Sequence, residues 1–117
     1  MHENVKQALV QATELDTRLI MRSLRNTERV LRNAAVDKIG EIEKAKGDAT
    51  TIEDIRALVG GIYPRVMQKG EMDAGAWSCG MVAGLIRDVP SCQELVERIM
   101  GEAEAIIARR LEGMRAA

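Results

Sequence analysis

The chain has 117 residues, of which 30% are charged and 46% hydrophobic, and its formal net charge is −1 at pH 7. This balance gives no basic field that would attract nucleic acid or an anionic membrane, and no stretch reaches the roughly 18 apolar residues of a membrane span or resembles a signal peptide. We therefore expect one cytoplasmic region over residues 1–117, without nucleic-acid or membrane partners.

The cysteines give no sign of a metal site. Cys79 and Cys92 do not lie at metal-ligand spacing from each other or from the one histidine, His2. A reducing compartment keeps thiols free. We expect two free thiols, no metal ion, and a His2 whose terminal position and polar neighbours give it no functional role.

Hydrophobic residues near the N-terminus recur at three- and four-residue steps, which is typical of an amphipathic helix. The pattern predicts a first helix of about three turns. Its apolar face would be made of Val5, Ala8, Leu9, Ala12 and Leu15.

A series of arginines follows this first helix. On a continuous helix they would align on one face and could bind a phosphate-bearing cofactor or nucleic acid. Charge runs are more often solvated faces that pair with acidic residues. From the residues alone, 17–32 can be helical or extended. The arginines are Arg18, Arg22, Arg25, Arg29 and Arg32.

A helix is predicted over the region of Ala35, Ile39 and Ile42, which repeat the helical spacing. Gly47 is a suitable residue for its end, and the lysines just before it suit the negative end of the helix dipole.

Thr51, followed three residues later by Asp54, predicts the start of a short helix that ends at Gly60-Gly61. The residues expected to face inward are Ile52, Ile55, Leu58 and Val59.

The segment 70–95 combines glycines and small residues with the only tryptophan. Each glycine inside a helix costs about 1 kcal/mol relative to alanine, so this enrichment indicates close backbone approach to a neighbouring element or to a ligand. We predict a helix beginning near Ala74. Trp77 would either anchor it or border a ligand pocket, and Gly80 and Gly84 would form a seam of small residues between helices.

The last helix has the clearest signals. Ser91 with Glu94 three residues on is a capping box. The apolar stripe that follows consists of Leu95, Ile99, Ala103, Ile106, Leu111 and Met114 with their neighbours.

Two stretches resemble one protein family. GEMDAGAWSCGMVAGLI (70–86) followed by DVPSCQELVERI (88–99), and DTRLIMRSLRNTERVLRNAAVDKIGEIE (16–43), lie in the order found in the C-terminal region of nitronate monooxygenases (2-nitropropane dioxygenases). These flavoenzymes include NAD(P)H:quinone reductases and, more distantly, a flavin-dependent enoyl-acyl-carrier-protein reductase. The quinone-reductase-like branch is the most similar.

The resemblance implies an FMN-dependent (β/α)8-barrel enzyme, of which this chain holds the C-terminal helical part. A complete barrel needs about 250 residues. We therefore expect an all-α fold of about five helices, with an extended connection near 17–24. The resemblance also implies structural roles in that connection, with Arg29 bonding carbonyl groups and Asn33 capping the next helix.

The family's catalytic histidine and its flavin-phosphate glycines belong to the barrel, so the resemblance implies no catalytic or confident cofactor-binding residue here and no FMN on this chain alone. Tyr63 and Lys69 are weaker candidates for polar contacts with a substrate. Nitronate-oxidising branches often carry glutamine where this chain has Met81, which favours quinone reduction. The residues expected to line the pocket over the flavin are Trp77, Ser78, Gly80 and Met81.

Three functions remain possible from the sequence. The chain can be the pocket-shaping C-terminal region of an FMN-dependent oxidoreductase, with the missing barrel as its partner. It can be a self-associating helical module without enzymatic activity, its apolar faces buried between copies. It can also be an anion-binding helical protein that uses the arginine series. Whether this chain is itself an enzyme is therefore left open.

Overall fold

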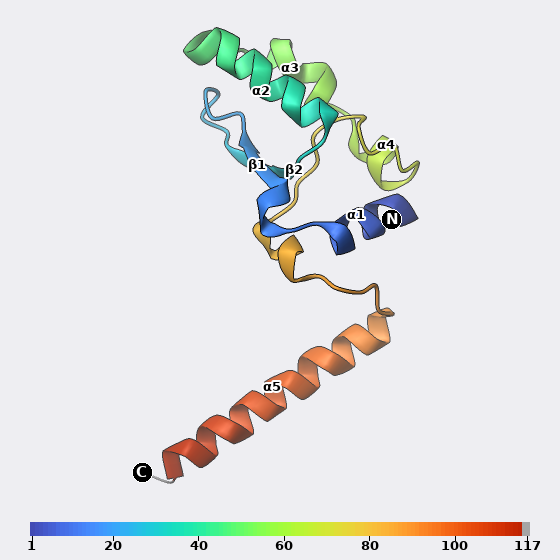
Figure 1. Cartoon of the computed structure of the whole chain (residues 1–117), viewed down its shortest axis with the longest axis vertical. Coiled ribbons are helices and arrows are strands. Elements are labelled where there is room, and N and C mark those ends of the chain that lie inside the picture. The colour runs from blue at the N-terminus through green and yellow to red at the C-terminus, as the bar shows by residue number, and fades with distance from the viewer. Residues whose placement is uncertain (116–117) are drawn as a thin grey trace. The chain divides into compact units, whose positions relative to one another are not determined.

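The computed structural model describes residues 1–115 (Figure 1). These residues divide into two units, residues 1–87 and the stretch from Asp88 onward, and we describe each by itself. In chain order the elements are α1 (Glu3–Gln11), β1 (Thr17–Ile20), β2 (Glu28–Leu31), α2 (Ala34–Lys46), α3 (Ile52–Val59), α4 (Tyr63–Met67) and α5 (Cys92–Arg115), with 3₁₀ helices at Glu14–Asp16, Gly47–Ala49 and Met81–Leu85.

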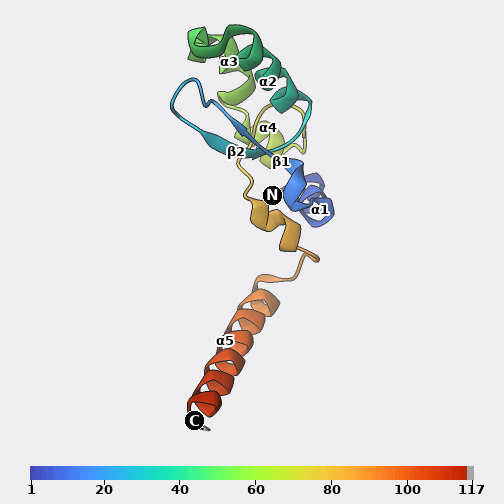
Figure 2. The same cartoon turned by 60° about the vertical axis from the view of Figure 1, so that its left-hand side comes forward.

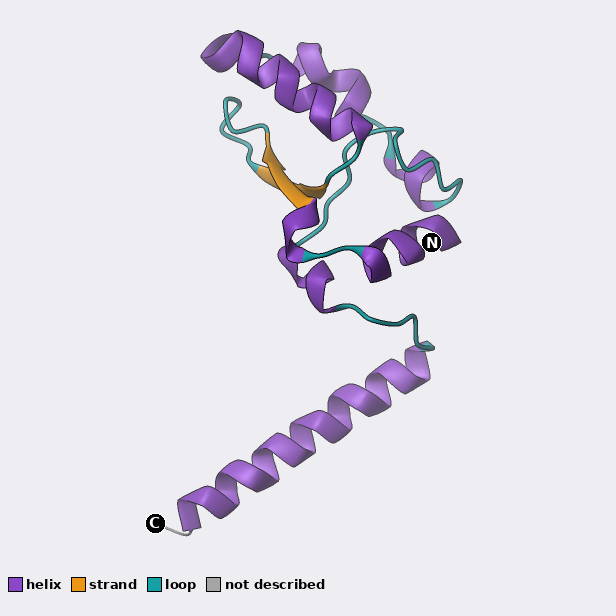
Figure 3. Cartoon of the chain, viewed as in Figure 1, coloured by secondary structure: helices purple, strands orange, loops and turns teal. Residues whose placement is uncertain are grey.

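The fold is mostly helical, but it is not all-α. β1 and β2 form a two-stranded antiparallel sheet in which Thr17 faces Leu31 and Ile20 faces Glu28 (Figure 3). The two strands lie side by side in both views (Figure 2). Residues 17–20 are thus extended, as the family resemblance implied for 17–24, whereas a turn occupies residues 22–25. The strands are only four residues long, too short for an alternating hydrophobic pattern to stand out in the sequence.

The hairpin also overturns the idea of an arginine-lined helix face. Arg18 and Arg32 both pair with Asp37 on α2, at 3.2 and 3.0 Å. Arg29 donates a hydrogen bond to the Thr17 hydroxyl at 2.8 Å, and not to a carbonyl as expected. Because the arginines lie in two strands, in the loop between them and, for Arg32, just after β2, no single helical face carries them.

One glutamate holds the hairpin loop. The backbone N–H of Met21 and the hydroxyl of Ser23 both donate to the Glu43 carboxylate of α2, at 3.1 and 2.9 Å. Met21 and Arg25 have positive φ angles of 57° and 54°, which cost side-chain-bearing residues conformational energy. The carboxylate compensates by satisfying polar groups in the turn.

α1 is shorter than predicted. It ends at Gln11, and Thr13 starts a separate 3₁₀ turn through a capping box with Asp16, whose carboxylate accepts the Thr13 N–H at 2.8 Å. Leu15 therefore leaves the apolar face of α1 and is 82% exposed.

The predicted middle helices are confirmed. The Asn33 side chain caps α2 by accepting the Val36 N–H at 2.9 Å, and α2 ends at Gly47, which has a φ of 53°. Thr51 and Asp54 form the capping box of α3. One detail was wrong: Ile52 was expected to face inward and is 44% exposed.

The segment around Trp77 is extended, so the helix predicted near Ala74 is wrong. The carbonyl of Trp77 accepts the N–H of Leu31 at 3.3 Å, and the N–H of Cys79 donates to the Arg29 carbonyl at 3.1 Å. The segment is therefore hydrogen-bonded along β2. The predicted close backbone approach does occur, at Gly75, where a Cβ atom would lie 2.5 Å from the Leu58 carbonyl oxygen.

Gly84 makes a second close approach. A Cβ atom there would lie 2.7 Å from the backbone nitrogen of Glu14, so this contact is with a 3₁₀ turn and not with another helix. At Gly80 the nearest atom would be 3.7 Å away, in Val82. The predicted seam of Gly80 and Gly84 between helices is therefore not formed.

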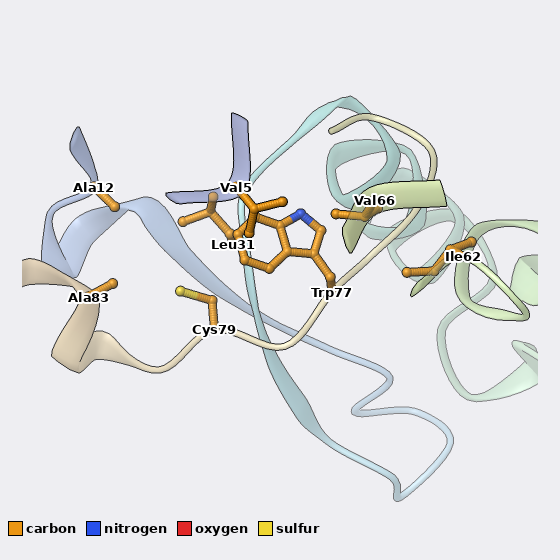
Figure 4. Close-up of a cluster of buried hydrophobic side chains, with 8 residues drawn as sticks. All are labelled: Val5, Ala12, Leu31, Ile62, Val66, Trp77, Cys79 and Ala83. Atoms are coloured by element: carbon orange, nitrogen blue, oxygen red, sulfur yellow. The ribbon is translucent and has the colours of Figure 1, made fainter. Parts of the chain in front are cut away.

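The first unit has two hydrophobic clusters, and β2 contributes to both. Val30 belongs to one cluster and Leu31 to the other. The Trp77 cluster consists of Val5, Ala12, Leu31, Ile62, Val66, Trp77, Cys79 and Ala83 (Figure 4). The α2 cluster consists of Ile20, Met21, Val30, Val36, Ile39, Ile55 and Ala76.

α5 has the predicted capping box: the Ser91 N–H donates to Glu94 at 2.7 Å and the Glu94 N–H donates to the Ser91 hydroxyl at 3.2 Å. A bidentate pair between Arg98 and Asp88 adds a second link near its start. Among the described residues of its own unit, 88–115, nothing covers the apolar stripe. The exposed apolar residues are Leu95, Val96, Ile99, Met100, Ile106, Ile107, Leu111 and Met114.

Candidate functional site

Trp77 is the largest fully buried side chain of the Trp77 cluster, with 2% of its surface exposed. Its indole lies among Val5, Leu31 and Val66, which come from α1, β2 and α4 (Figure 4). Because the extended segment at 77–79 is hydrogen-bonded along β2, the indole position is fixed by backbone as well as by packing.

A groove of about 230 Å³ lies beside this cluster. Three of the four residues predicted to line a pocket, Trp77, Ser78 and Gly80, border it, and Met81 does not; Met81 is 51% exposed. The wall is mostly apolar, which is typical of ligand pockets. The full lining is Met1, Val5, Leu9, Met67, Trp77, Ser78, Cys79, Gly80, Val82, Ala83 and Ile86.

The indole nitrogen of Trp77 carries an unused hydrogen. It is buried and finds no acceptor among residues 1–115. An unsatisfied buried donor costs about 1–3 kcal/mol, so a carbonyl oxygen that reached this N–H would gain a hydrogen bond at little desolvation cost.

Cys79 is a packing residue of the groove wall. Burial raises the pKa of its thiol, and its S–H donates to the Gly80 carbonyl at 3.6 Å. A thiol with a raised pKa holds little thiolate at neutral pH and reacts slowly. Cys79 and the exposed Cys92 are both free.

Ser78 also belongs to a polar cluster that sequence reasoning found only in part. The Tyr63 and Ser78 hydroxyl oxygens lie 2.7 Å apart, the Ser78 N–H donates to the Tyr63 oxygen at 3.1 Å, and the Ser78 hydroxyl donates to the Glu28 carboxylate. Tyr63 was a weaker candidate. Glu28 was missed, because 50 residues separate it from Ser78 and only the pairing with β2 joins them. Lys69, the other weaker candidate, is exposed.

No three His, Cys, Asp or Glu side chains within residues 1–115 lie close enough to hold a metal ion. Over the same residues, no helix is long and apolar enough to cross a membrane. His2 caps α1 by accepting the Asn4 N–H at 3.1 Å.

The family model described as nitronate monooxygenase matches residues 1–102. The chain belongs to the nitronate monooxygenase family. Among solved structures, this nitronate monooxygenase family chain is similar to FabK from Thermotoga maritima, with 28% sequence identity and a TM-score of 0.78 over 96% of the chain. An M276A mutant of the same FabK matches with 26% identity and a TM-score of 0.72, again over 96%.

The chain spans about a third of the length of these structures, 34% and 31% respectively. For a nitronate monooxygenase relative, FMN is the cofactor that the resemblance implies. The groove of about 230 Å³ is smaller than the roughly 300–1,000 Å³ of pockets that enclose drug-sized ligands, and its lining offers no cationic side chain for a phosphate. It does not fit the whole cofactor, although it has room for one ring, since a cavity of about 150 Å³ holds benzene.

Proposed function

We propose that this chain is the C-terminal, substrate-side region of an FMN-dependent oxidoreductase of the nitronate monooxygenase family, working in the cytoplasm. In this proposal Trp77, Ser78 and Gly80 shape one wall of the pocket over the flavin ring, and Met81 lies at its edge. The observation that carries the proposal is the apolar groove, which three of these residues line in a chain whose residues 1–102 match the family.

The substrate we propose is a quinone, reduced at the expense of NAD(P)H. Met81 stands where nitronate-oxidising relatives often have glutamine, and the groove wall is apolar, which suits a hydrophobic ring better than a small charged nitronate. FMN would carry the hydride chemistry when bound. This chain's own residues would bind and orient the ring and exclude water from it.

The proposal includes no catalysis by this chain alone. We expect the 117-residue chain to retain no FMN after reconstitution and desalting, because its groove accommodates one ring and no phosphate. An absorbance spectrum tests this expectation, and a stoichiometric flavin peak in the visible band would contradict it.

The pocket role itself is tested in a longer protein that contains this sequence together with a barrel. We expect Trp77→Ala to raise the KM for the quinone while leaving the flavin content unchanged, because the phosphate would be gripped elsewhere. A loss of thermal stability with unchanged acceptor kinetics would indicate that Trp77 serves packing only. Trp77 and Ser78 would then no longer count as pocket residues.

The partner we propose for α5 is the rest of such a barrel. Its apolar residues recur at steps of three and four and make a stripe wider than a coiled-coil seam, as seen in helices that pack on a globular core. In the second candidate function, the chain is a self-associating module without enzymatic activity, and the same stripe is covered by another copy. The flavin content of the longer protein distinguishes the two candidate functions. Bound flavin supports the oxidoreductase, and its absence supports the self-associating module.

A further inference from the structure

The cluster of Glu28, Ser78 and Tyr63 brings together side chains from β2, the extended segment and α4. We propose that this cluster binds a guanidinium group, either of a small molecule or of an arginine side chain of a protein partner. The cluster shares Ser78 with the apolar groove but differs from it in being polar, and the proposal does not depend on the proposed enzymatic function.

The hydrogen bonds of the cluster determine which hydrogens remain for a ligand. The Glu28 carboxylate has no hydrogen to give when ionised, so the Ser78 hydroxyl hydrogen lies on the bond to Glu28. The hydrogen between Tyr63 and Ser78 must then belong to the Tyr63 hydroxyl. The Ser78 N–H is used by the Tyr63 oxygen. Every hydroxyl and amide hydrogen of the cluster is therefore used in a hydrogen bond within it. Only lone pairs remain, and they can accept hydrogen bonds from a ligand.

Within residues 1–115, no cationic side chain neutralises the Glu28 carboxylate. Glu28 is half-buried, and the ion pairs between residues 1–115 involve other carboxylates, so no lysine or arginine nitrogen in that range lies within 4.0 Å of it. A partly desolvated carboxylate without a cationic partner favours a positively charged ligand. Together with the remaining lone pairs, it selects a cation that carries several N–H donors.

The acceptors and the Tyr63 side chain together favour a guanidinium group over an ammonium group. Tyr63 is 45% exposed, so a ligand at the cluster can contact its side chain. A guanidinium group is planar, stacks on aromatic rings, and presents five donors in a fixed fork. It can therefore reach the carboxylate and a hydroxyl oxygen together, whereas an ammonium group is a compact, strongly hydrated point charge.

The test is a two-dimensional NMR titration of the full 117-residue chain with N-acetyl-arginine amide. We expect saturable shifts of the Ser78 amide and the Tyr63 ring. N-acetyl-citrulline amide has nearly the same shape without the charge, and N-acetyl-lysine amide has the charge without the planar fork. The citrulline amide should bind about fivefold more weakly, the size of one exposed charged contact. The lysine amide should also bind more weakly, because its ammonium group lacks the planar fork of donors.

Three variants locate the site. Glu28→Gln keeps an oxygen that can accept the Ser78 hydroxyl but removes the charge, so the internal network survives and affinity should fall about fivefold. Tyr63→Phe removes one acceptor and should also weaken binding. Glu41→Gln, an exposed glutamate of α2, is the matched control and should leave affinity unchanged.

Equal shifts with citrulline, or equal affinity in Glu28→Gln and Glu41→Gln, would overturn the proposal. A second titration identifies the source of the guanidinium. Affinity about tenfold higher for an arginine-containing pentapeptide than for methylguanidinium supports a protein partner, and equal affinity supports a small molecule.

Discussion

Gly75 and Gly80 lie in the same segment but have different surroundings, so a methyl group added at each should have different effects. Gly75 lies against the backbone of α3, where a Cβ atom would sit 2.5 Å from the Leu58 carbonyl oxygen. Gly80 borders the groove with its nearest neighbour atom 3.7 Å away. A methyl group at Gly75 must displace main chain, and one at Gly80 meets only ordinary contact.

We predict that Gly75→Ala lowers the free energy of unfolding by about 1–3 kcal/mol, the usual cost of overpacking. Gly80→Ala should change it by less than about 0.5 kcal/mol, the range of a tolerated surface change. Urea denaturation followed by circular dichroism measures both. Equal losses in the two variants would show that the backbone contact at Leu58 does not matter.

The unsatisfied indole N–H of Trp77 leads to a second prediction. Trp77→Ala should cost about 3–5 kcal/mol, as for other buried aromatic residues. Trp77→Phe keeps a ring in the same place and removes the buried donor that has no acceptor within residues 1–115, so it should cost clearly less. Thermal melts of both variants test this. A Phe variant as unstable as the Ala variant would mean that the N–H is satisfied in solution.

At the scale of elements, capping groups determine where helices begin. One of them, Asp54, has a pKa that its hydrogen bonds lower. The Asp54 carboxylate accepts hydrogen bonds from Lys46, at the end of α2, and from the backbone N–H of Thr51. These bonds lower the pKa of Asp54 from 3.8 to about 2. The half-buried Asp54 carboxylate thus ties the start of α3 to the end of α2.

The lowered pKa predicts an acid dependence. A carboxyl group whose pKa is depressed in the folded state stabilises that state above its unfolded pKa, and the effect is lost as pH falls through the folded value. Asp54→Asn should therefore melt below the parent chain at pH 7, and the gap should close between pH 3.8 and about 2. Asp48→Asn, an exposed control, should show no such convergence. A gap that is constant with pH would contradict the linkage.

Sequence reasoning succeeded where signals are local. Capping boxes such as Thr51 with Asp54 and Ser91 with Glu94 act within three residues, so their patterns can be read directly. The cap at Asn33 was implied by the family resemblance. Sequence reasoning failed where long-range pairing overrides local preference. The helix expected near Ala74 is replaced by a segment paired with β2, and Glu28 meets Ser78 only through that pairing.

The candidate groove was anticipated through Trp77, Ser78 and Gly80, which the family resemblance indicated. The reason given for the glycines, close approach, holds at Gly75 and Gly84 and not at Gly80. Met81 was expected in the groove from the family resemblance, but it starts the 3₁₀ turn Met81–Leu85 and is 51% exposed.

For the whole molecule, the main feature is an amphipathic helix whose apolar side is uncovered within its own unit. Single exposed hydrophobic residues are common, but a continuous row along 24 helical residues is not. We expect such a row to find a cover, from the proposed barrel or from a second copy.

We therefore predict that the isolated chain self-associates at micromolar to millimolar concentration, and that Ile99→Glu combined with Ile106→Glu makes it monomeric. Multi-angle light scattering measures both. Glu97→Gln with Glu104→Gln, changes on the same helix, should leave the association intact. A compact monomer at high concentration in the parent chain would contradict the prediction.

The buried position of Trp77 has a spectroscopic consequence. The chain has one tryptophan and one tyrosine, so under 295 nm excitation its fluorescence comes from a single indole packed among Val5, Leu31 and Val66. Its emission maximum should be blue-shifted and should move to the red when the first unit unfolds. The sequence thus contains its own probe for following the unfolding of the first unit.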